Sequence, residues 1–224
     1  MKRRIQIDSA LLSFFIILTG FLYQFPKFYF QSINVDDLMD FVGLLFILKG
    51  TFLRMVSRGY KMAHSQKSRE LVTGGPYAYT RNPMYLGSFL MGVGFVLLVW
   101  PWWSLPVFAG LFYMRFRPQI LAEEKILAEN FPQAYERFAA KVPRMFPKID
   151  GWLKMDFRKT FPQDVLWTTK EKWGLVAWPV VAAVLESLQE KLVYGFTDLH
   201  HTMFLAVMAG IVFALSAVVM YRYV

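Results

Sequence analysis

The chain of 224 residues contains no cysteine, which excludes disulfides, thiol catalysis and cysteine-ligated metals. Only 3 residues are histidine. Of these, His200 and His201 are adjacent in sequence and have no carboxylate cluster beside them, so we expect no metal site. The sequence also lacks a phosphate-binding P-loop, a dinucleotide-binding glycine fingerprint and a nucleophile elbow. Any catalytic site must therefore be built from other residue types.

The residues that are abundant are apolar. They make up 56% of the chain, aromatic residues alone make up 18%, and the mean hydropathy is +0.35. This composition is typical of a membrane protein with several spans. The net charge of +9 does not indicate nucleic acid as a partner. The basic residues are concentrated in particular loops, and the positive-inside rule and contact with anionic membrane lipids explain that pattern more simply.

Apolar segments predict an all-α, polytopic membrane protein with about six transmembrane helices. The predicted spans are residues 9–25, 38–55, 84–100, 102–116, 173–188 and 203–221. The first resembles the apolar region of a signal peptide but lacks a small-residue cleavage site, so we expect it to be uncleaved. The fourth is expected to continue past Arg115 as one long helix, with Pro118 as a possible kink. The distribution of basic loops predicts that both termini are cytoplasmic.

The most informative segment, residues 71–87, reads LVTGGPYAYTRNPMYLG. Gly74 and Gly75 allow unusual backbone angles and a close approach to a ligand. Pro83 suits the first turn of a helix, whose free N–H groups could bind a carboxylate or phosphate. Arg81 could bind either a lipid phosphate or a substrate carboxylate. The alternative is a structured loop that only leads into a span.

A second polar segment begins at Glu123 and Glu124, which we expect to open an amphipathic helix. Its apolar stripe has spacings of three and four residues and consists of Leu127, Phe131, Tyr135 and Phe138. The two carboxylates could simply be favourable charges near a helix start. They could instead accept hydrogen bonds from a ribose or bind a cationic cofactor. By the predicted topology, both polar segments lie on the cytoplasmic side.

Taken together, the two segments resemble the isoprenylcysteine carboxyl methyltransferase family, whose wider group includes phospholipid methyltransferases. That pattern reads G-x-Y, R-H-P-x-Y-x-G, a helical hairpin, E-E-x-x-L, F-G-x-x-Y and V-P-x-x-x-P. The second segment matches it with EEKILAENFPQAYERFAAKVPRMFP at 123–147. The resemblance covers residues 71–147, and the spans at 9–25 and 38–55 fit the hairpin that precedes the pattern in the family. It implies an integral membrane methyltransferase with a helical fold.

The resemblance also implies S-adenosylmethionine as methyl donor, held between the loop before the third span and the helix after the fourth. The implied cofactor contacts are Leu71, Val72, Tyr77, Asn82, Pro83, Met84, Tyr85, Glu123 and Glu124. Within this set, residues 82–85 would hold the amino-acid end and sulfonium of the cofactor, and the two glutamates its ribose. Arg81 and Arg117 are the candidates for orienting an anionic acceptor.

This sequence departs from the family pattern at several positions. Asn82 replaces the motif histidine and cannot titrate near neutral pH. Gln119 lies where eukaryotic members have a substrate-binding arginine, and Pro132 replaces the glycine of F-G. A carboxylate acceptor is ionised at pH 7 and needs no general base, so the loss of the histidine favours a carboxylate, or a thiol entering as thiolate.

The sequence therefore predicts methyl transfer to a lipid-like or isoprenoid acceptor. Sterol reductases share a similar G-x-Y and R-H-P-x-Y element and use NADPH, which leaves a reductase as one alternative. A non-enzymatic membrane protein that keeps the fold is the other. We expect a methyltransferase core at 1–147, an interfacial linker at 148–172 and a C-terminal helix pair at 173–224. We also expect location in a bacterial inner membrane, lipophilic substrates and possible homo-oligomers.

Overall fold

The computed structural model describes residues 14–29, 33–65, 70–148, 170–193 and 195. Within these residues all regular structure is helical, as predicted. Residues 14–22 form a helix. The main helices that follow are α2 (Ile33–His64), α3 (Pro83–Val99), α4 (Leu105–Asn130), α5 (Pro132–Lys141) and α8 (Gly174–Val193). Short 3-10 helices are η1 (Pro26–Phe28), η3 (Gly75–Ala78), η4 (Trp102–Ser104) and η6 (Lys170–Trp173).

Where the structure describes the predicted spans, most of their residues are helical, although the first span leaves its helix after residue 22. The segment at 38–55 lies inside α2, the segment at 84–100 matches α3, and the segment at 173–188 lies within α8 apart from its first residue. The segment at 102–116 enters α4, which continues to Asn130 as one helix containing Pro118, as predicted. Among the described residues, no helix combines the length and the apolar character that crossing a bilayer requires. The segment at 203–221, most of the linker and both histidines at 200–201 lie outside the described residues.

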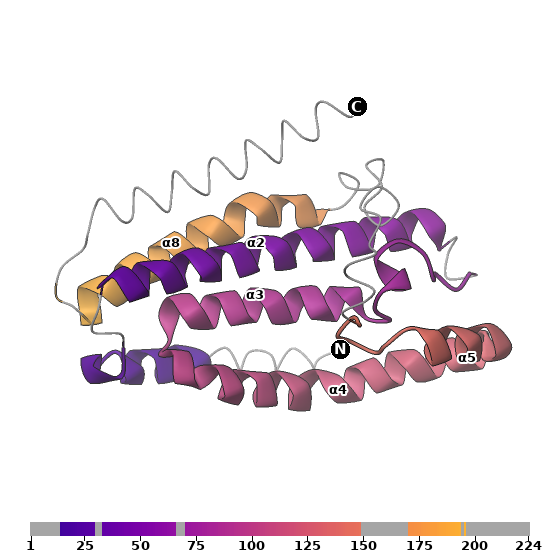
Figure 1. Ribbon diagram of the computed structural model, residues 1–224, viewed down its shortest axis with the longest axis horizontal. Coiled ribbons are helices and arrows are strands. Elements are labelled where there is room, and N and C mark those ends of the chain that lie inside the picture. The colour runs from indigo at the N-terminus through magenta and orange to yellow at the C-terminus, as the bar shows by residue number, and fades with distance from the viewer. Residues whose placement is uncertain (1–13, 30–32, 66–69, 149–169, 194, 196–224) are drawn as a thin grey trace, which may run out of the picture.

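The long helices lie side by side, with α3 between α2 and α4 and with α8 along the other side of α2 (Figure 1). The α2–α3 pair has the most extensive contact. Glycines explain how close the two helices come. A Cβ added at Gly50 would lie 2.5 Å from the carbonyl oxygen of Gly87, and one at Gly94 would lie 2.4 Å from that of Gly43. Small residues at a helix crossing allow such close backbone approach.

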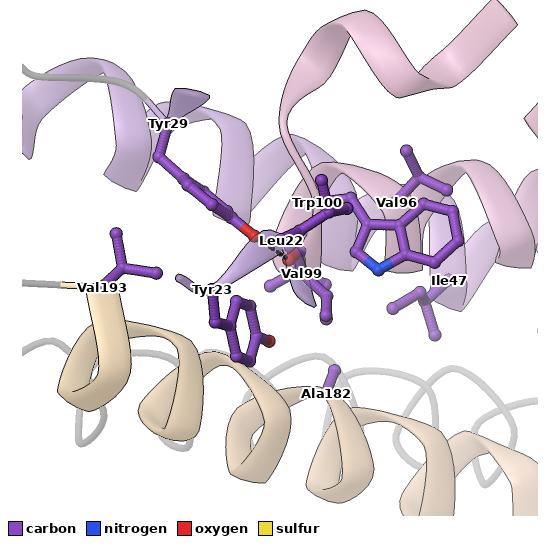
Figure 2. Packing of buried hydrophobic residues seen from close by; sticks show 10 residues of the cluster. Leu22, Tyr23, Tyr29, Ile47, Val96, Val99, Trp100, Ala182 and Val193 are labelled. Atoms are coloured by element: carbon purple, nitrogen blue, oxygen red, sulfur yellow. Dashed lines mark hydrogen bonds between the residues drawn. The ribbon is translucent and has the colours of Figure 1, made fainter. Parts of the chain in front are cut away.

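A hydrophobic core forms at the end of the bundle opposite the polar segments, where residues 22–29 meet α2, α3 and α8 (Figure 2). The buried Tyr29 donates a hydrogen bond from its hydroxyl to the carbonyl oxygen of Val99 over 3.3 Å, which anchors the N-terminal segment to the end of α3. Trp100 donates from its indole nitrogen to Thr19 Oγ1 over 2.8 Å. This core fixes the helices that extend toward the other end.

One prediction about the second polar segment is wrong. Glu123 and Glu124 do not open a helix but lie well inside α4, and the apolar stripe is divided between α4 and α5. The break falls at Phe131, whose φ and ψ of −136° and 60° are not helical. Pro132 causes it, because proline disfavours a helical residue before it and suits the first position of a new helix.

Candidate functional site

The two polar segments meet around one cavity of about 630 Å³. Its lining residues come from the end of α2, the beginning of α3 and the region where α4 passes into α5. Figure 1 shows these parts of the helices at the same end of the bundle. Residues 71–85 supply one part of its lining, and α4 supplies another through Phe116, Gln119, Glu123, Ile126, Leu127 and Asn130. A cavity of this size is in the range of small-molecule binding sites.

The η3 turn shapes the wall formed by residues 71–77. Gly75 has a φ of +55°, in the left-handed region, and a Cβ there would lie 2.6 Å from the ring of Tyr60. Glycine is therefore needed both for the backbone angle and for the contact with α2. The turn places Tyr77 in a buried cluster with Tyr135 and Phe138. Burial raises the pKa of the Tyr77 hydroxyl above its ordinary value, and the negative charge of Glu123 adds to the shift.

Glu123 is the carboxylate that α4 contributes to the lining of the cavity, which also includes Glu70. Its Oε1 accepts a hydrogen bond from the hydroxyl of Tyr85 over 2.6 Å and another from Nε2 of Gln119 over 3.1 Å. Tyr85 comes from the first turn of α3, and its ring packs against Phe116 of α4 with the centroids 5.7 Å apart. These contacts orient one acid on the wall and connect α3 with α4 across the cavity.

Glu124 makes a different set of contacts. It is buried, and its Oε1 accepts a hydrogen bond from Nδ2 of Asn82 over 3.0 Å. Nε of Arg144 reaches both of its oxygens, over 3.2 and 3.0 Å. Nη1 of Arg81 lies 3.4 Å from Oε2. Glu124 thus joins the loop before α3 to the segment after α5, and it is absent from the lining of the cavity.

The segment after α5 holds the loop through its backbone carbonyls. The backbone N–H of Arg81 donates to the carbonyl oxygen of Pro143 over 2.9 Å. The hydroxyl of Thr80 donates to the carbonyl oxygen of Met145 over 2.7 Å, and Nδ2 of Asn82 donates to that of Arg144 over 3.0 Å. The V-P-R-M-F-P tail is therefore a structural support of the loop at 80–82.

The guanidinium of Arg81 is directed toward its protein partners. Besides Glu124, Nη1 donates to the hydroxyl of Tyr135 over 3.2 Å. Arg117 is exposed and lies over the ring of Tyr113, with Cζ 5.5 Å from the centroid, and it does not line the cavity. Of the two arginines predicted to orient an acceptor, only Arg81 reaches the cavity, and it shares the carboxylate of Glu124 with Arg144.

Most of the predicted site residues come together. Those that line the cavity are Leu71, Val72, Tyr77, Arg81, Asn82, Pro83, Met84, Tyr85 and Glu123. Glu124 and Arg117 lie outside its lining. Sequence reasoning did not identify Arg54 or Arg144. Arg54 belongs to an apolar predicted span, where a basic residue is itself a functional signal. Arg144 has no such signal, because an arginine after V-P looks like an ordinary surface residue.

Comparisons with known proteins give matches to methyltransferases. A family model described as phospholipid methyltransferase matches residues 39–134. A protein-S-isoprenylcysteine O-methyltransferase of Schizosaccharomyces pombe is 32% identical over 134 residues, which cover 56% of each chain. This chain is therefore similar to protein-S-isoprenylcysteine O-methyltransferases over about half of its length. The protein of the same name from Saccharomyces cerevisiae is 29% identical over 141 residues, which cover 59% of each chain.

The proteins similar to this chain also include a nickel-cobalt-cadmium resistance protein, NccN of Alcaligenes xylosoxydans xylosoxydans. It is 31% identical over 108 residues, which cover 48% of this chain and 49% of that protein. The chain thus spans about half the length of the curated relatives that it matches. No solved structure matches it. The family match includes most of α2, all of α3 and α4 and the beginning of α5, and it stops before Arg144.

Proposed function

We propose that this chain is an integral membrane methyltransferase that uses S-adenosylmethionine and modifies the carboxylate of a lipid-like or isoprenoid acceptor. The observation that carries the proposal is the cavity. Both segments of the methyltransferase pattern contribute residues to its lining, and Glu123 is one of them. The similarity to named isoprenylcysteine methyltransferases supports the same reaction class.

The residues present are suited to this cofactor. Glu123 offers a carboxylate, held by Tyr85 and Gln119, that can accept hydrogen bonds from ribose hydroxyls. Leu71 and Val72 offer apolar surface on the same lining. When bound, S-adenosylmethionine supplies an activated methyl group, whose transfer to a carboxylate oxygen forms a methyl ester while the carbon–sulfur bond breaks and its electron pair stays on sulfur.

The protein's own contribution is to bind and orient. An acceptor carboxylate is already ionised at neutral pH, so no residue has to remove a proton from it. This suits a site in which Asn82 stands in place of a titratable histidine. The amide of Asn82 holds the loop against Glu124 and the carbonyl of Arg144, and the loop in turn brings Met84 and Tyr85 to the cavity wall. Orientation of two reactants is by itself a large source of rate enhancement.

Exposed apolar side chains support placement in a membrane. On α8 the exposed set consists of Val176, Trp178, Val180, Val181, Val184, Leu188 and Leu192. An apolar surface of this extent indicates contact with lipid or with another protein. In the proposed orientation, the cavity faces the cytoplasm of a bacterial cell, where the cofactor is available, and a lipophilic acceptor enters from the bilayer. The same exposed surface of α8 is also available for a contact between copies of the chain.

Calorimetry with S-adenosylhomocysteine tests the proposal. Purified protein should bind it, and Glu123→Ala should weaken the binding at least about tenfold, the effect of losing hydrogen bonds to a charged group. Glu129→Ala is the matched control, because Glu129 is an exposed carboxylate on the same helix that pairs with Lys125 over 3.8 Å. Unchanged affinity in Glu123→Ala would exclude the assigned ribose contact.

Two further measurements separate the proposal from its alternatives. Competition between S-adenosylhomocysteine and NADPH distinguishes a methyltransferase from a reductase, since displacement by NADPH alone would favour the latter. Membranes containing the protein and labelled S-adenosylmethionine should yield a labelled, base-labile methyl ester in the lipid fraction. Cofactor binding without any such product, over a range of carboxylate acceptors, would favour the non-enzymatic alternative.

A further inference from the structure

We infer that Arg117 of α4 and Lys172, just before α8, bind the phosphates of anionic membrane lipids and so fix how deeply the protein sits in the bilayer. The inference rests on the membrane placement in the proposed function and does not depend on methyl transfer. Both residues lie outside the lining of the cavity, so this is a second contact surface of the protein.

Each of the two cations lies over an exposed aromatic ring. Cζ of Arg117 is 5.5 Å from the ring centroid of Tyr113, and Nζ of Lys172 is 5.8 Å from that of Trp173. Tyr113 is 58% exposed and Trp173 is 68% exposed. Such rings are enriched where a membrane meets water, and attraction to a ring restricts the positions of the cation above it. We refer to these contacts as the Arg117–Tyr113 pair and the Lys172–Trp173 pair.

Each pair lies where an apolar outer surface ends. From 105 to 114, α4 contains no charged residue, and exposed charged side chains such as Lys125 follow Arg117. On α8, the exposed apolar residues begin at Val176, just after the Lys172–Trp173 pair, and extend to Leu192. They cover about 24 Å along the helix axis, which fits within the hydrocarbon core of a bilayer, about 30 Å thick. Both pairs are therefore placed at an edge of that core.

The two pairs also lie at a similar level on opposite sides of the bundle. Arg117 is in the middle of α4, and Trp173 directly precedes α8. Figure 1 shows the beginning of α8 level with the middle of α4 along the bundle, with α2 and α3 between them. Two cations at one level on opposite faces can both reach the headgroups of the same leaflet.

Chemistry favours a lipid phosphate as the group that these cations bind. The planar guanidinium of Arg117 matches two phosphate oxygens, and the ammonium of Lys172 is a compact charge that also binds phosphate. Basic residues beside a bilayer are attracted to its anionic lipids. Because each cation adjoins exposed apolar side chains, a molecule with both a phosphate and acyl chains fits this surface better than a free phosphate does.

This placement also sets the depth of the cavity. Glu123 follows Arg117 on the same helix, about 9 Å further along the axis. The carboxylate that α4 contributes to the cavity is therefore on the water side of the lipid phosphates, where a polar cofactor can reach it. Phe116, which precedes Arg117 and also lines the cavity, is at the level of the phosphates. The cavity thus extends from the headgroups toward water.

Native mass spectrometry of the protein in nanodiscs tests the inference. The nanodiscs contain equal parts of dioleoyl phosphatidylglycerol and dioleoyl phosphatidylcholine, and the lipids that stay bound on release are counted. We expect the wild type to retain phosphatidylglycerol in preference. Arg117→Gln and Lys172→Gln should each reduce that preference about fivefold, the effect of one basic residue near an anionic surface. Arg117→Lys should retain most of it.

Lys125→Gln and Arg137→Gln are the matched controls. Each removes one positive charge from an exposed position, on α4 beyond the Arg117–Tyr113 pair or on α5. Both should keep the wild-type preference, because their cations are not at the level of the headgroups. Circular dichroism establishes that every variant keeps its helical content.

The outcomes distinguish this inference from the proposed function. It is overturned if the wild type retains both lipids equally, if the controls lose the preference as Arg117→Gln does, or if inorganic phosphate displaces the phosphatidylglycerol. In those cases the methyltransferase proposal still depends on calorimetry with S-adenosylhomocysteine. If the preference depends on Arg117 and Lys172 but the protein does not bind S-adenosylhomocysteine, the lipid contact stands and the enzymatic proposal fails.

Discussion

Asn82 and Glu124 are 42 positions apart in the chain, yet the side-chain amide of the first donates to the carboxylate of the second over 3.0 Å. The same nitrogen donates to the carbonyl oxygen of Arg144 over 3.0 Å. Both residues are buried. One amide therefore joins the loop before α3, the long helix α4 and the segment after α5. The residue that replaces the histidine of the family pattern is a hydrogen-bond donor that holds three segments together.

Replacing Asn82 should destabilise the protein in a graded order. Asn82→Ala leaves a buried oxygen of Glu124 and the carbonyl of Arg144 each without one donor, which should lower the free energy of unfolding by about 1–3 kcal/mol. Asn82→Asp should lower the free energy of unfolding further, because it places a second carboxylate against Glu124. Asn82→His keeps a ring N–H donor and should lose the least stability of the three variants. Denaturant unfolding in detergent measures this order. Equal stability of the Ala and His variants would contradict the assigned role.

The glycine crossing between α2 and α3 should not tolerate added volume. In Gly50→Ala, the new Cβ would lie 2.5 Å from the carbonyl oxygen of Gly87 and 2.8 Å from the backbone nitrogen of Met91, so the helices must separate. Overpacking of this kind costs about 1–3 kcal/mol. Thermal unfolding should therefore give a lower melting temperature for Gly50→Ala than for the wild type.

Gly110→Ala is the matched control for the crossing. It lies in α4, and a Cβ there meets nothing within 4 Å. Alanine has the higher helix propensity, so this change should be neutral or should stabilise by up to about 1 kcal/mol. A similar loss in both variants would mean that the α2–α3 contact is looser than described.

Tyr77 should make the fold sensitive to alkali. Burial, and then the charge of Glu123, raise the pKa of its hydroxyl in the folded protein, so folding favours the neutral form. Its contribution to stability is fully present below about pH 10, the pKa of an unfolded tyrosine, and is lost as the pH rises toward the folded value. Tyr77→Phe should therefore flatten the fall in stability above about pH 10.

The control for the alkaline prediction is Tyr113→Phe, which changes a tyrosine that is 58% exposed. That variant should follow the wild-type profile of melting temperature against pH. An unchanged profile in Tyr77→Phe would show that the hydroxyl, which donates to the carbonyl oxygen of Ser57 over 3.4 Å, ionises as it does in the unfolded chain.

Much of the helical fold could be predicted from composition and turn chemistry. Long apolar runs located α2, α3 and α8, and Pro83 marked the start of α3 because proline suits a first helical turn. The continuation of α4 past Arg115 was predicted too. The helix start assigned to Glu123 was wrong, because the two acidic residues were weighed more heavily than Pro132. A proline is the stronger signal, since it removes a donor and restricts its neighbour.

The site was predictable only as far as its motifs reach. Residues 71–85 and Glu123 could be assigned because both segments have a recognisable order of residue types. The difference between Glu123 and Glu124 could not, because adjacent helical residues point about 100° apart and the sequence does not say which one faces the cavity. Arg54 was missed for a related reason. Its place depends on Gly87, where an added Cβ would lie 2.7 Å from Cγ of Arg54, and no local pattern encodes such a contact between helices.

Apart from the adjacent Ile126 and Leu127, the cavity residues of α4 from Phe116 to Asn130 follow one another at steps of three or four positions on a single helix. Such a helix has a fixed phase, so deleting one residue between Phe116 and Glu123 would turn the acid by about 100° and shift it by about 1.5 Å. Deletions or insertions of one or two residues in this part of α4 would therefore turn Glu123 away from the cavity. A change of two full helical turns would keep its side chain on the same face. The number of residues between Phe116 and Glu123 therefore determines the direction in which the carboxylate of Glu123 points.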